Sequence, residues 1–231
     1  MISANKIIVA LDTQEEDKLS NLFANLRGEK IWVKVGMELF YAMGPKVIHE
    51  AKEKGFQVFL DLKLHDIPNT VSQSLKALSK LPIDMVNVHA AGGKEMMMKS
   101  YEALAHLPKR PLLIAVTQLT STTQAQMNAD QRIPGTIEDS VLHFATLAHE
   151  AQFDGVVSSP LEVKRIKEKL GSPFLTVTPG IRPAGGDLND QKRVTTPLEA
   201  IALGTDYMVI GRPITQAHDP KAALKAILEG K

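Results

Sequence analysis

The stretch Gln57-Val58-Phe59-Leu60-Asp61-Leu62-Lys63 places charged residues inside an otherwise apolar run. Such a run is typical of a buried β-strand, in which successive side chains point to opposite faces. This period of two puts Phe59, Asp61 and Lys63 on one face and the aliphatic residues between them on the other. An isolated buried charge is costly, so the charged face is expected to be ion-paired or functional.

Further apolar runs rich in Val, Ile and Leu extend this pattern along the chain. The eight predicted strands are Lys6–Leu11, Ile31–Val35, Gln57–Leu62, Met85–His89, Leu112–Thr117, Gly155–Ser158, Phe174–Thr178 and Tyr207–Ile210. They recur about every 29 residues, which is the size of one strand–helix unit. Amphipathic helices are predicted between them, for example over Pro45–Lys54 and Glu138–Ala151.

This repeat predicts an α/β fold, a (β/α)₈ TIM barrel that forms a single domain over residues 1–231. An open, doubly wound parallel sheet has the same periodicity and stays an alternative, because periodicity does not show closure. No break in composition suggests a second domain. The hydrophobic content of 44% is sufficient for a sizeable core.

Composition excludes several classes of protein. The 27 basic and 26 acidic side chains nearly balance, which argues against a general nucleic-acid binder. The absence of cysteine excludes disulfides, thiolate zinc sites and a cysteine nucleophile. No apolar run approaches the roughly 20 residues of a membrane span, and Met1 to Lys6 do not resemble the start of a signal peptide. We therefore expect a soluble, cytoplasmic protein.

Charged residues follow or interrupt the first three predicted strands: Asp12, Lys34, Asp61, Lys63 and Asp66. The carboxyl ends of parallel barrel strands meet at one mouth, where barrel enzymes have their active sites. An alternative is a buried salt-bridge network that only stabilises the fold. The gathering of two lysines and three aspartates favours an active site.

A second group of residues points to phosphate. Gly211 and Arg212 follow the last predicted strand directly, and the loops after strands seven and eight of such barrels commonly bind phosphate. Glycine lets backbone N–H groups approach the phosphate oxygens, and arginine binds them through two parallel hydrogen bonds. Arg182 and Gln191 can add donors from Pro179–Pro197, a stretch that is either an exposed loop or a mobile lid. The pattern predicts a phosphorylated small-molecule substrate.

The ten residues Asp61-Leu62-Lys63-Leu64-His65-Asp66-Ile67-Pro68-Asn69-Thr70 resemble the signature Asp-x-Lys-x-x-Asp-Ile-Pro-Asn-Thr of the orotidine 5′-monophosphate decarboxylase family. This signature is highly specific. Moderately specific matches occur in family order along the whole chain: Ala10-Leu11-Asp12, Lys34-Val35-Gly36, Val116 to Ser121, Thr178-Pro179-Gly180-Ile181-Arg182-Pro183 and Ile210-Gly211-Arg212-Pro213-Ile214.

The resemblance implies a homodimeric barrel that converts orotidine 5′-monophosphate to uridine 5′-monophosphate and carbon dioxide, the last step of de novo UMP synthesis. It implies no metal and no organic cofactor. Lys63 would donate the proton to pyrimidine C6, and Asp61 would lie against the departing carboxylate. Lys34 and Asp66 would complete the array of charges.

The resemblance also implies substrate contacts. Asp12 and Lys34 would hold the ribose hydroxyls, and Thr120 would contact the pyrimidine. The residues expected to bind the phosphate or close over it are Arg182, Gln191, Gly211 and Arg212. Those expected to enter the partner subunit's site are Asp66, Ile67 and Thr70.

Three alternative functions stay open from the residues. A metal-dependent phosphosugar decarboxylase or lyase of the same suprafamily shares Asp-x-Lys-x-x-Asp, but it uses a carboxylate on strand two to help hold magnesium, where this chain has Lys34. A Schiff-base aldolase would use Lys63 or Lys34. A non-catalytic phosphometabolite-binding barrel is disfavoured because Lys63 and Asp61 are both present.

His89 ends a strand facing inward, either at the site or as a hydrogen-bonded structural residue.

Overall fold

The computed structural model describes residues 1–183 and 194–230, and these contain eight parallel strands that form a closed barrel in sequential order. The strands are β1 (Ile7–Ala10), β2 (Trp32–Gly36), β3 (Gln57–Leu64), β4 (Met85–His89), β5 (Leu112–Val116), β6 (Gly155–Val157), β7 (Leu175–Thr178) and β8 (Tyr207–Ile210). β1 pairs with both β2 and β8, which closes the ring. The predicted (β/α)₈ barrel is confirmed, and the open sheet is excluded.

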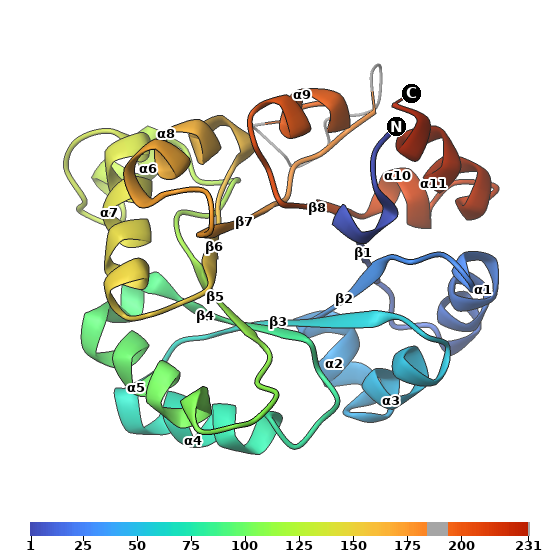
Figure 1. Ribbon diagram of the computed structural model, residues 1–231, viewed down its shortest axis with the longest axis horizontal. Coiled ribbons are helices and arrows are strands. Elements are labelled where there is room, and N and C mark those ends of the chain that lie inside the picture. Colours follow the sequence, from blue (N-terminus) through green and yellow to red (C-terminus); the bar gives the residue numbers. More distant parts are fainter. Residues whose placement is uncertain (184–193, 231) are drawn as a thin grey trace.

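Helices surround the ring of strands on its outside (Figure 1). They are α1 (Glu16–Leu26), α2 (Met37–Met43), α3 (Lys46–Glu53), α4 (Pro68–Leu78), α5 (Gly93–Ala105), α6 (Gln124–Ala129), α7 (Ile137–Glu150), α8 (Pro160–Leu170), α9 (Pro197–Ala202), α10 (Arg212–Thr215) and α11 (Pro220–Glu229), with the 3₁₀ helices η1 (Ala4–Lys6) and η2 (Ala90–Gly92). The two predicted helices correspond to α3 and α7. In the described parts of the chain, no helix is both long and apolar enough to cross a bilayer.

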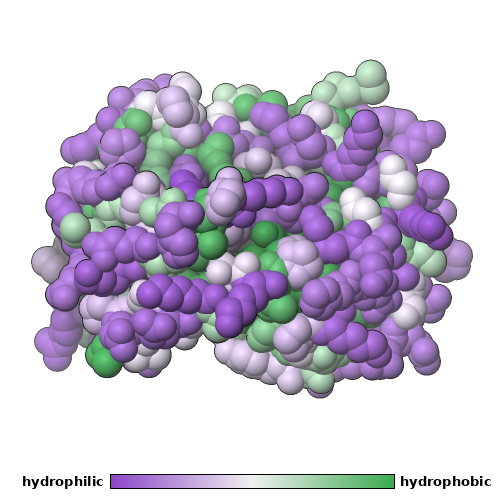
Figure 2. All heavy atoms as spheres, turned by 60° about the horizontal axis from the view of Figure 1, so that its bottom comes forward, coloured by the Kyte–Doolittle hydropathy of each residue, from purple (hydrophilic) through white to green (hydrophobic). Residues whose placement is uncertain are grey.

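The barrel has two apolar layers, one inside the ring and one between the ring and the helices. The inner layer is formed by Ile8, Ala10, Phe59, Met85, Ile114, Val177 and Val209. The outer layer includes Val58, Leu60 and Leu62, so the predicted alternation along β3 is confirmed. Figure 2 shows a largely hydrophilic face on which hydrophobic atoms are visible mainly in its recessed centre, as expected when apolar side chains are buried.

β3 continues to Leu64, beyond its predicted end, because its register with β4 shifts. Leu60 is paired with Val86 and Leu64 with Val88, so β3 contains two additional residues over this interval. Within it, Lys63 adopts a φ of 50°. This left-handed conformation is unfavourable for a residue with a side chain, and irregularities of this kind re-aim side chains near active sites. The Lys63 N–H donates to Asn87 Oδ1 at 2.8 Å, which stabilises the irregular backbone.

The opposite end of the barrel is held by aspartates that stand immediately before β4, β6 and β8: Asp84, Asp154 and Asp206. The Oδ2 atom of each accepts a backbone N–H from the neighbouring strand at 2.7–2.8 Å, at Val58, Leu113 and Thr176. Each also forms a salt bridge at 2.5–2.6 Å, with Lys52, Arg110 and Lys167, respectively. These contacts fasten the amino ends of the strands, away from the mouth where the charged residues lie.

Candidate active site

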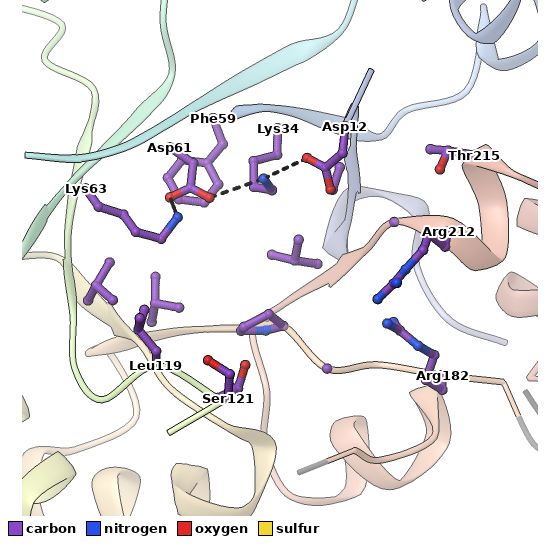
Figure 3. A pocket seen from close by; sticks show the side chains of 18 of the residues that line it. Asp12, Lys34, Phe59, Asp61, Lys63, Leu119, Ser121, Arg182, Arg212 and Thr215 are labelled. Atoms are coloured by element: carbon purple, nitrogen blue, oxygen red, sulfur yellow. Dashed lines mark hydrogen bonds and ion pairs between the residues drawn. The ribbon is translucent and has the colours of Figure 1, made fainter. Parts of the chain in front are cut away.

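A cavity of about 460 Å³ lies at the carboxyl ends of the barrel strands. Its lining includes eight of the residues predicted from sequence: Asp12, Lys34, Asp61, Lys63, Thr120, Arg182, Gly211 and Arg212. Figure 3 shows lysines and aspartates along one side of this cavity and two arginines on another. Gln191, also predicted to bind phosphate, lies outside the described residues.

The charged side is a chain of alternating charges from β1, β2 and β3 (Figure 3). Lys34 Nζ lies 3.4 Å from Asp12 Oδ1 and 3.2 Å from Asp61 Oδ2. Lys63 Nζ lies 2.8 Å from Asp61 Oδ1. Neighbouring strands of a parallel barrel end side by side, and inward-facing positions at those ends therefore bring these four side chains together.

Asp61 is the centre of this chain of charges and is held by several donors. Besides the two lysines, Asn87 Nδ2 donates to Asp61 Oδ1 at 2.7 Å. The side chain of Asp61 is only 9% exposed. A carboxylate held from both oxygens cannot turn away when another negative group arrives, and this rigidity is what electrostatic catalysis requires.

Asn87 was missed by the sequence reasoning. It is fully buried on β4 and links Asp61 with the backbone of Lys63. The available signal was an amide at an inward-facing position of the otherwise apolar run Met85–Val88, where a buried polar group must have a hydrogen-bond partner.

Burial and charge act in opposite directions on the pKa values in this array. Burial alone would lower the pKa of Lys34, but the carboxylates of Asp61 and Asp12 outweigh it, and the pKa lies above its ordinary value. Burial alone would raise the pKa of Asp61, but Lys34, Lys63 and the hydrogen bond from Asn87 outweigh it, and the pKa lies below its ordinary value. Both groups are therefore charged at neutral pH.

The arginines come from the segments after β7 and β8 and point into the cavity (Figure 3). Arg182 is 7% exposed, and its Nη1 donates to the carbonyl oxygen of Ile181 at 2.9 Å. Ile181 pairs with Thr195, and this pairing joins the two ends of the Pro179–Pro197 stretch next to the arginine. Residues 184–193, where the predicted lid would lie, are outside the described residues.

Gly211 lines the cavity next to Arg212. A Cβ atom at Gly211 would lie 3.5 Å from Ala10 Cβ and 3.7 Å from Asp12 Oδ2, which are ordinary contact distances. The barrel would therefore tolerate the volume of a methyl group here. Glycine at this position leaves the backbone open to the approach of a ligand.

The loop after β5 supplies polar groups that sequence reasoning identified only in part. Thr120 was predicted, but Gln118 and Ser121 line the cavity as well. Gln118 Nε2 donates to Ser140 Oγ at 3.1 Å, which anchors this loop to α7. Apolar wall residues complete the cavity: Ala10, Phe59, Val116, Val157 and Val209.

Asp66, Ile67 and Thr70 do not line the cavity of their own subunit. Asp66 is exposed, and its Oδ1 accepts the Ile67 N–H at 2.7 Å. Ile67 is 67% exposed, and Thr70 is exposed in the first turn of α4. Of the charged residues expected at one mouth, Asp66 alone lies apart. The chain turns outward after the irregular backbone at Lys63 to begin α4 at Pro68.

His89 is also absent from the lining of this cavity. Its Nδ1 accepts the Ala91 N–H at 3.2 Å. Of the two roles predicted for His89, a residue of the site or a hydrogen-bonded structural residue, this contact favours the second. Across residues 1–183 and 194–230, no group of three or more His, Cys, Asp or Glu residues is arranged to hold a metal ion.

The fold and the cavity define a (β/α)₈ barrel with alternating charges over β1 to β3 and arginines after β7 and β8. Comparison with known proteins makes this assignment specific: the chain belongs to the orotidine 5′-phosphate decarboxylase / HUMPS family, whose family model matches residues 5–227. Two curated orotidine 5′-phosphate decarboxylases, from Staphylococcus aureus strains Newman and Mu3, are 53% and 52% identical to it over 222 residues, covering 96% of either chain.

Solved structures agree with the sequence comparison. Orotidine 5′-phosphate decarboxylase from Lactobacillus acidophilus superposes with a TM-score of 0.85 at 43% identity, covering 98% of both chains. An uncharacterized conserved protein from Geobacillus kaustophilus superposes with a TM-score of 0.86 at 42% identity, covering 97% of this chain and 99% of the other. At this identity and coverage, the likeness extends over the barrel and the segments that form the cavity.

Proposed function

We propose that this protein decarboxylates orotidine 5′-monophosphate to uridine 5′-monophosphate and carbon dioxide, the last step of de novo UMP synthesis. The observation that carries the proposal is the fixed Lys34–Asp61–Lys63 array, which shares one cavity with Arg182 and Arg212. We also propose that the enzyme is a single-domain, cytoplasmic homodimer that works without a metal or an organic cofactor.

The reaction needs fixed charge because it forms a carbanion. The bond between C6 and the carboxyl carbon breaks, carbon dioxide leaves, and the electron pair remains on C6. The Lys63 ammonium stabilises this developing charge and then transfers a proton from Nζ to C6, leaving a neutral amine. Its 2.8 Å contact with Asp61 holds Nζ at the charged side of the cavity.

Asp61 raises the energy of the bound substrate relative to the transition state. Two negative charges 4 Å apart repel by about 4 kcal/mol at an effective dielectric constant of about 20. Loss of neutral carbon dioxide removes this repulsion. Lys34 and Asn87 prevent Asp61 from moving away in the substrate complex, so the repulsion is released only by reaction.

The arginine side of the cavity supplies binding energy remote from the reacting carbon. Arg182 and Arg212 match the charge and the geometry of a phosphate group. Contacts that hold the phosphate fix the position of the pyrimidine over β3, so binding energy is used for orientation at C6.

Lys34 supports a metal-free reaction. Its ammonium lies between the carboxylates of Asp12 and Asp61, at 3.4 Å and 3.2 Å, where a bridging metal ion would need to be. A divalent cation would have to displace Lys34 or bind next to its positive charge. This arrangement disfavours the metal-dependent phosphosugar lyase.

The homodimer is supported by the residues that point away from their own cavity. Ile67 is a large aliphatic side chain with 67% exposure, which a partner surface would cover. Asp66 and Thr70 flank it on the β3–α4 turn and the first turn of α4. We propose that all three enter the site of the partner subunit.

A spectrophotometric assay tests the proposed function. Purified protein, incubated with excess EDTA, is expected to consume orotidine 5′-monophosphate, with loss of its absorbance and formation of uridine 5′-monophosphate. Lys63→Ala should lower kcat by about 10²–10⁴-fold, the range for loss of a general acid. Lys164→Ala, a matched change at a side chain with 75% exposure on α8, should retain full activity. A wild-type protein that is inactive, or active only after magnesium is added, would overturn the proposal.

A further inference from the structure

A pair of stacked histidines lies beside the catalytic array but outside the cavity. The rings of His65 and His89 have their centroids 5.6 Å apart and their planes inclined by 20°. His65 follows β3, and His89 is the last residue of β4. The two strands end side by side, so the stack joins the segment that leaves β3 to the end of its neighbour.

Each ring is also tied to the backbone after β4. His89 Nδ1 accepts the Ala91 N–H at 3.2 Å and so caps η2, which places the proton of the neutral ring on Nε2. His65 packs against the same short helix, since a Cβ atom at Gly92 would be 3.3 Å from His65 Cδ2. Neutral His89 therefore links η2 to the ring of His65, a residue that is itself exposed to solvent.

The position of His65 in the sequence connects this unit to the proposed chemistry. Lys63, two residues earlier, has the left-handed backbone conformation and points into the cavity. Asp66, one residue later, lies outside that cavity. His65 thus occupies the short segment in which the chain changes from one direction to the other.

We propose that the His65–His89 stack is a positioning element. It fixes the turn between β3 and α4 so that Lys63 reaches the reacting carbon and Asp66 is held outside the cavity of its own subunit. The inference rests on the proposed function for its catalytic consequence. Neither histidine touches the substrate cavity, so both act through Lys63 and the turn rather than as acids or bases.

The stack requires a neutral His89. Protonation at Nδ1 would remove the acceptor for Ala91 and place a positive charge beside Lys63. The ionisable groups that act on His89 are His65 and Lys63. Burial first, and then these two groups, hold the pKa of His89 below its ordinary value of 6.5. On its other side, η2 and Gly93 present no ionisable side chain, and the following Lys94 is paired with Glu150 of α7 at 2.6 Å. The stack is therefore intact above pH 6.5 and is lost as the pH falls through the lowered pKa of His89.

Substitutions separate the stack from the hydrogen bond. His89→Asn keeps an acceptor for Ala91 but removes the ring, and His65→Asn removes the opposite ring. His89→Phe keeps a ring that can stack and does not titrate. His149→Asn is the matched control, because it removes another ring contact, with Phe174 at 5.3 Å, at the amino end of β7 far from the mouth.

The kinetic test measures kcat and KM for orotidine 5′-monophosphate between about pH 5 and about pH 8, where a histidine titrates. At the upper end, His89→Asn and His65→Asn should lower kcat about tenfold, the order expected from a small displacement of Lys63, with little change in KM. His149→Asn should stay near wild type there. His89→Phe keeps a stacking ring but loses the acceptor for Ala91, so its kcat should lie between that of wild type and that of the asparagine variants. His89→Phe should retain more of its kcat than wild type at the acid end. Unchanged kcat in both asparagine variants, or an identical acid limb in His89→Phe and wild type, would overturn the proposal.

An NMR titration tests the stack without using activity. The His89 ring resonance of the wild-type protein should titrate below pH 6.5, and His65→Asn should raise that pKa by removing one of its causes. A His89 pKa that is unaffected by His65→Asn would contradict the stacked arrangement. If the wild-type protein fails to decarboxylate the substrate while His89 titrates as expected, the proposed function is wrong, but the contact between the His65 and His89 rings is still supported.

Discussion

Replacement of Asn87 by alanine should disconnect the two parts of the catalytic array. Asn87 donates to Asp61 Oδ1 at 2.7 Å and accepts the Lys63 N–H at 2.8 Å, and it is fully buried. A hydrogen bond to a charged group contributes about 1.5–3 kcal/mol. If the whole of one such contact is realised only in the transition state, kcat falls by about 10-fold to about 150-fold.

The same substitution should also destabilise the fold. It leaves the Lys63 N–H without its acceptor, and an unsatisfied buried donor costs about 1–3 kcal/mol. The measurements are kcat and KM from the loss of substrate absorbance, and the free energy of unfolding from urea titration. We expect kcat to fall much more than KM rises, because Asn87 does not line the substrate cavity.

Ser100→Ala is the control for Asn87→Ala. Ser100 is fully buried on α5 and donates to the Met96 carbonyl oxygen at 2.7 Å, but it belongs to no part of the array. It should lose stability with kcat unchanged. If Asn87→Ala behaves in the same way, losing stability while kcat stays at the wild-type value, then the anchoring of Asp61 and Lys63 by Asn87 has no catalytic role.

Three further predictions concern the contact with phosphate, the shared site of the dimer, and the aspartates at the amino ends of the strands. Arg212→Ala should cost about 1.5–3 kcal/mol in kcat/KM on the nucleotide and almost nothing on the nucleoside that lacks phosphate; an equal penalty on both would assign Arg212 another role. Lys63→Ala and Asp66→Ala homodimers should each be nearly inactive, whereas random co-refolding should restore about a quarter of wild-type activity through heterodimers with one intact site. Heterodimers without activity would place Asp66 in its own subunit's site. Asp154→Asn should lower the free energy of unfolding by about 1–3 kcal/mol, through its contact with Arg110, without changing kcat, and a loss of kcat at full stability would contradict that purely structural role.

Local patterns in the sequence were sufficient for the architecture and for most of the charged site. Strand residues alternate with a period of two, and this period placed Phe59 inside the barrel and Asp61 and Lys63 at its cavity. Parallel strands all end on one side, so residues at the ends of strands far apart in sequence, such as Asp12 and Arg212, could be expected at the same mouth.

Other features depended on contacts between segments that no local pattern relates. The left-handed backbone of Lys63 depends on the register of β3 against β4 and on an acceptor from Asn87, 24 residues away. The position of Asp66 after β3 predicted it at the same mouth as Lys63, whereas the resemblance implied that it enters the partner subunit's site. The turn carries Asp66 out of the cavity of its own subunit.

The sequence by itself therefore determined the repeat of strands and helices, the end of the barrel that carries charge, and the resemblance to a family. Only the tertiary structure decided that the sheet closes, that Asn87 holds Asp61, and that His65 stacks on His89. The physical reason is that propensity and periodicity act over a few neighbouring residues. Closure, register and side-chain contacts between strands depend on how the whole chain packs.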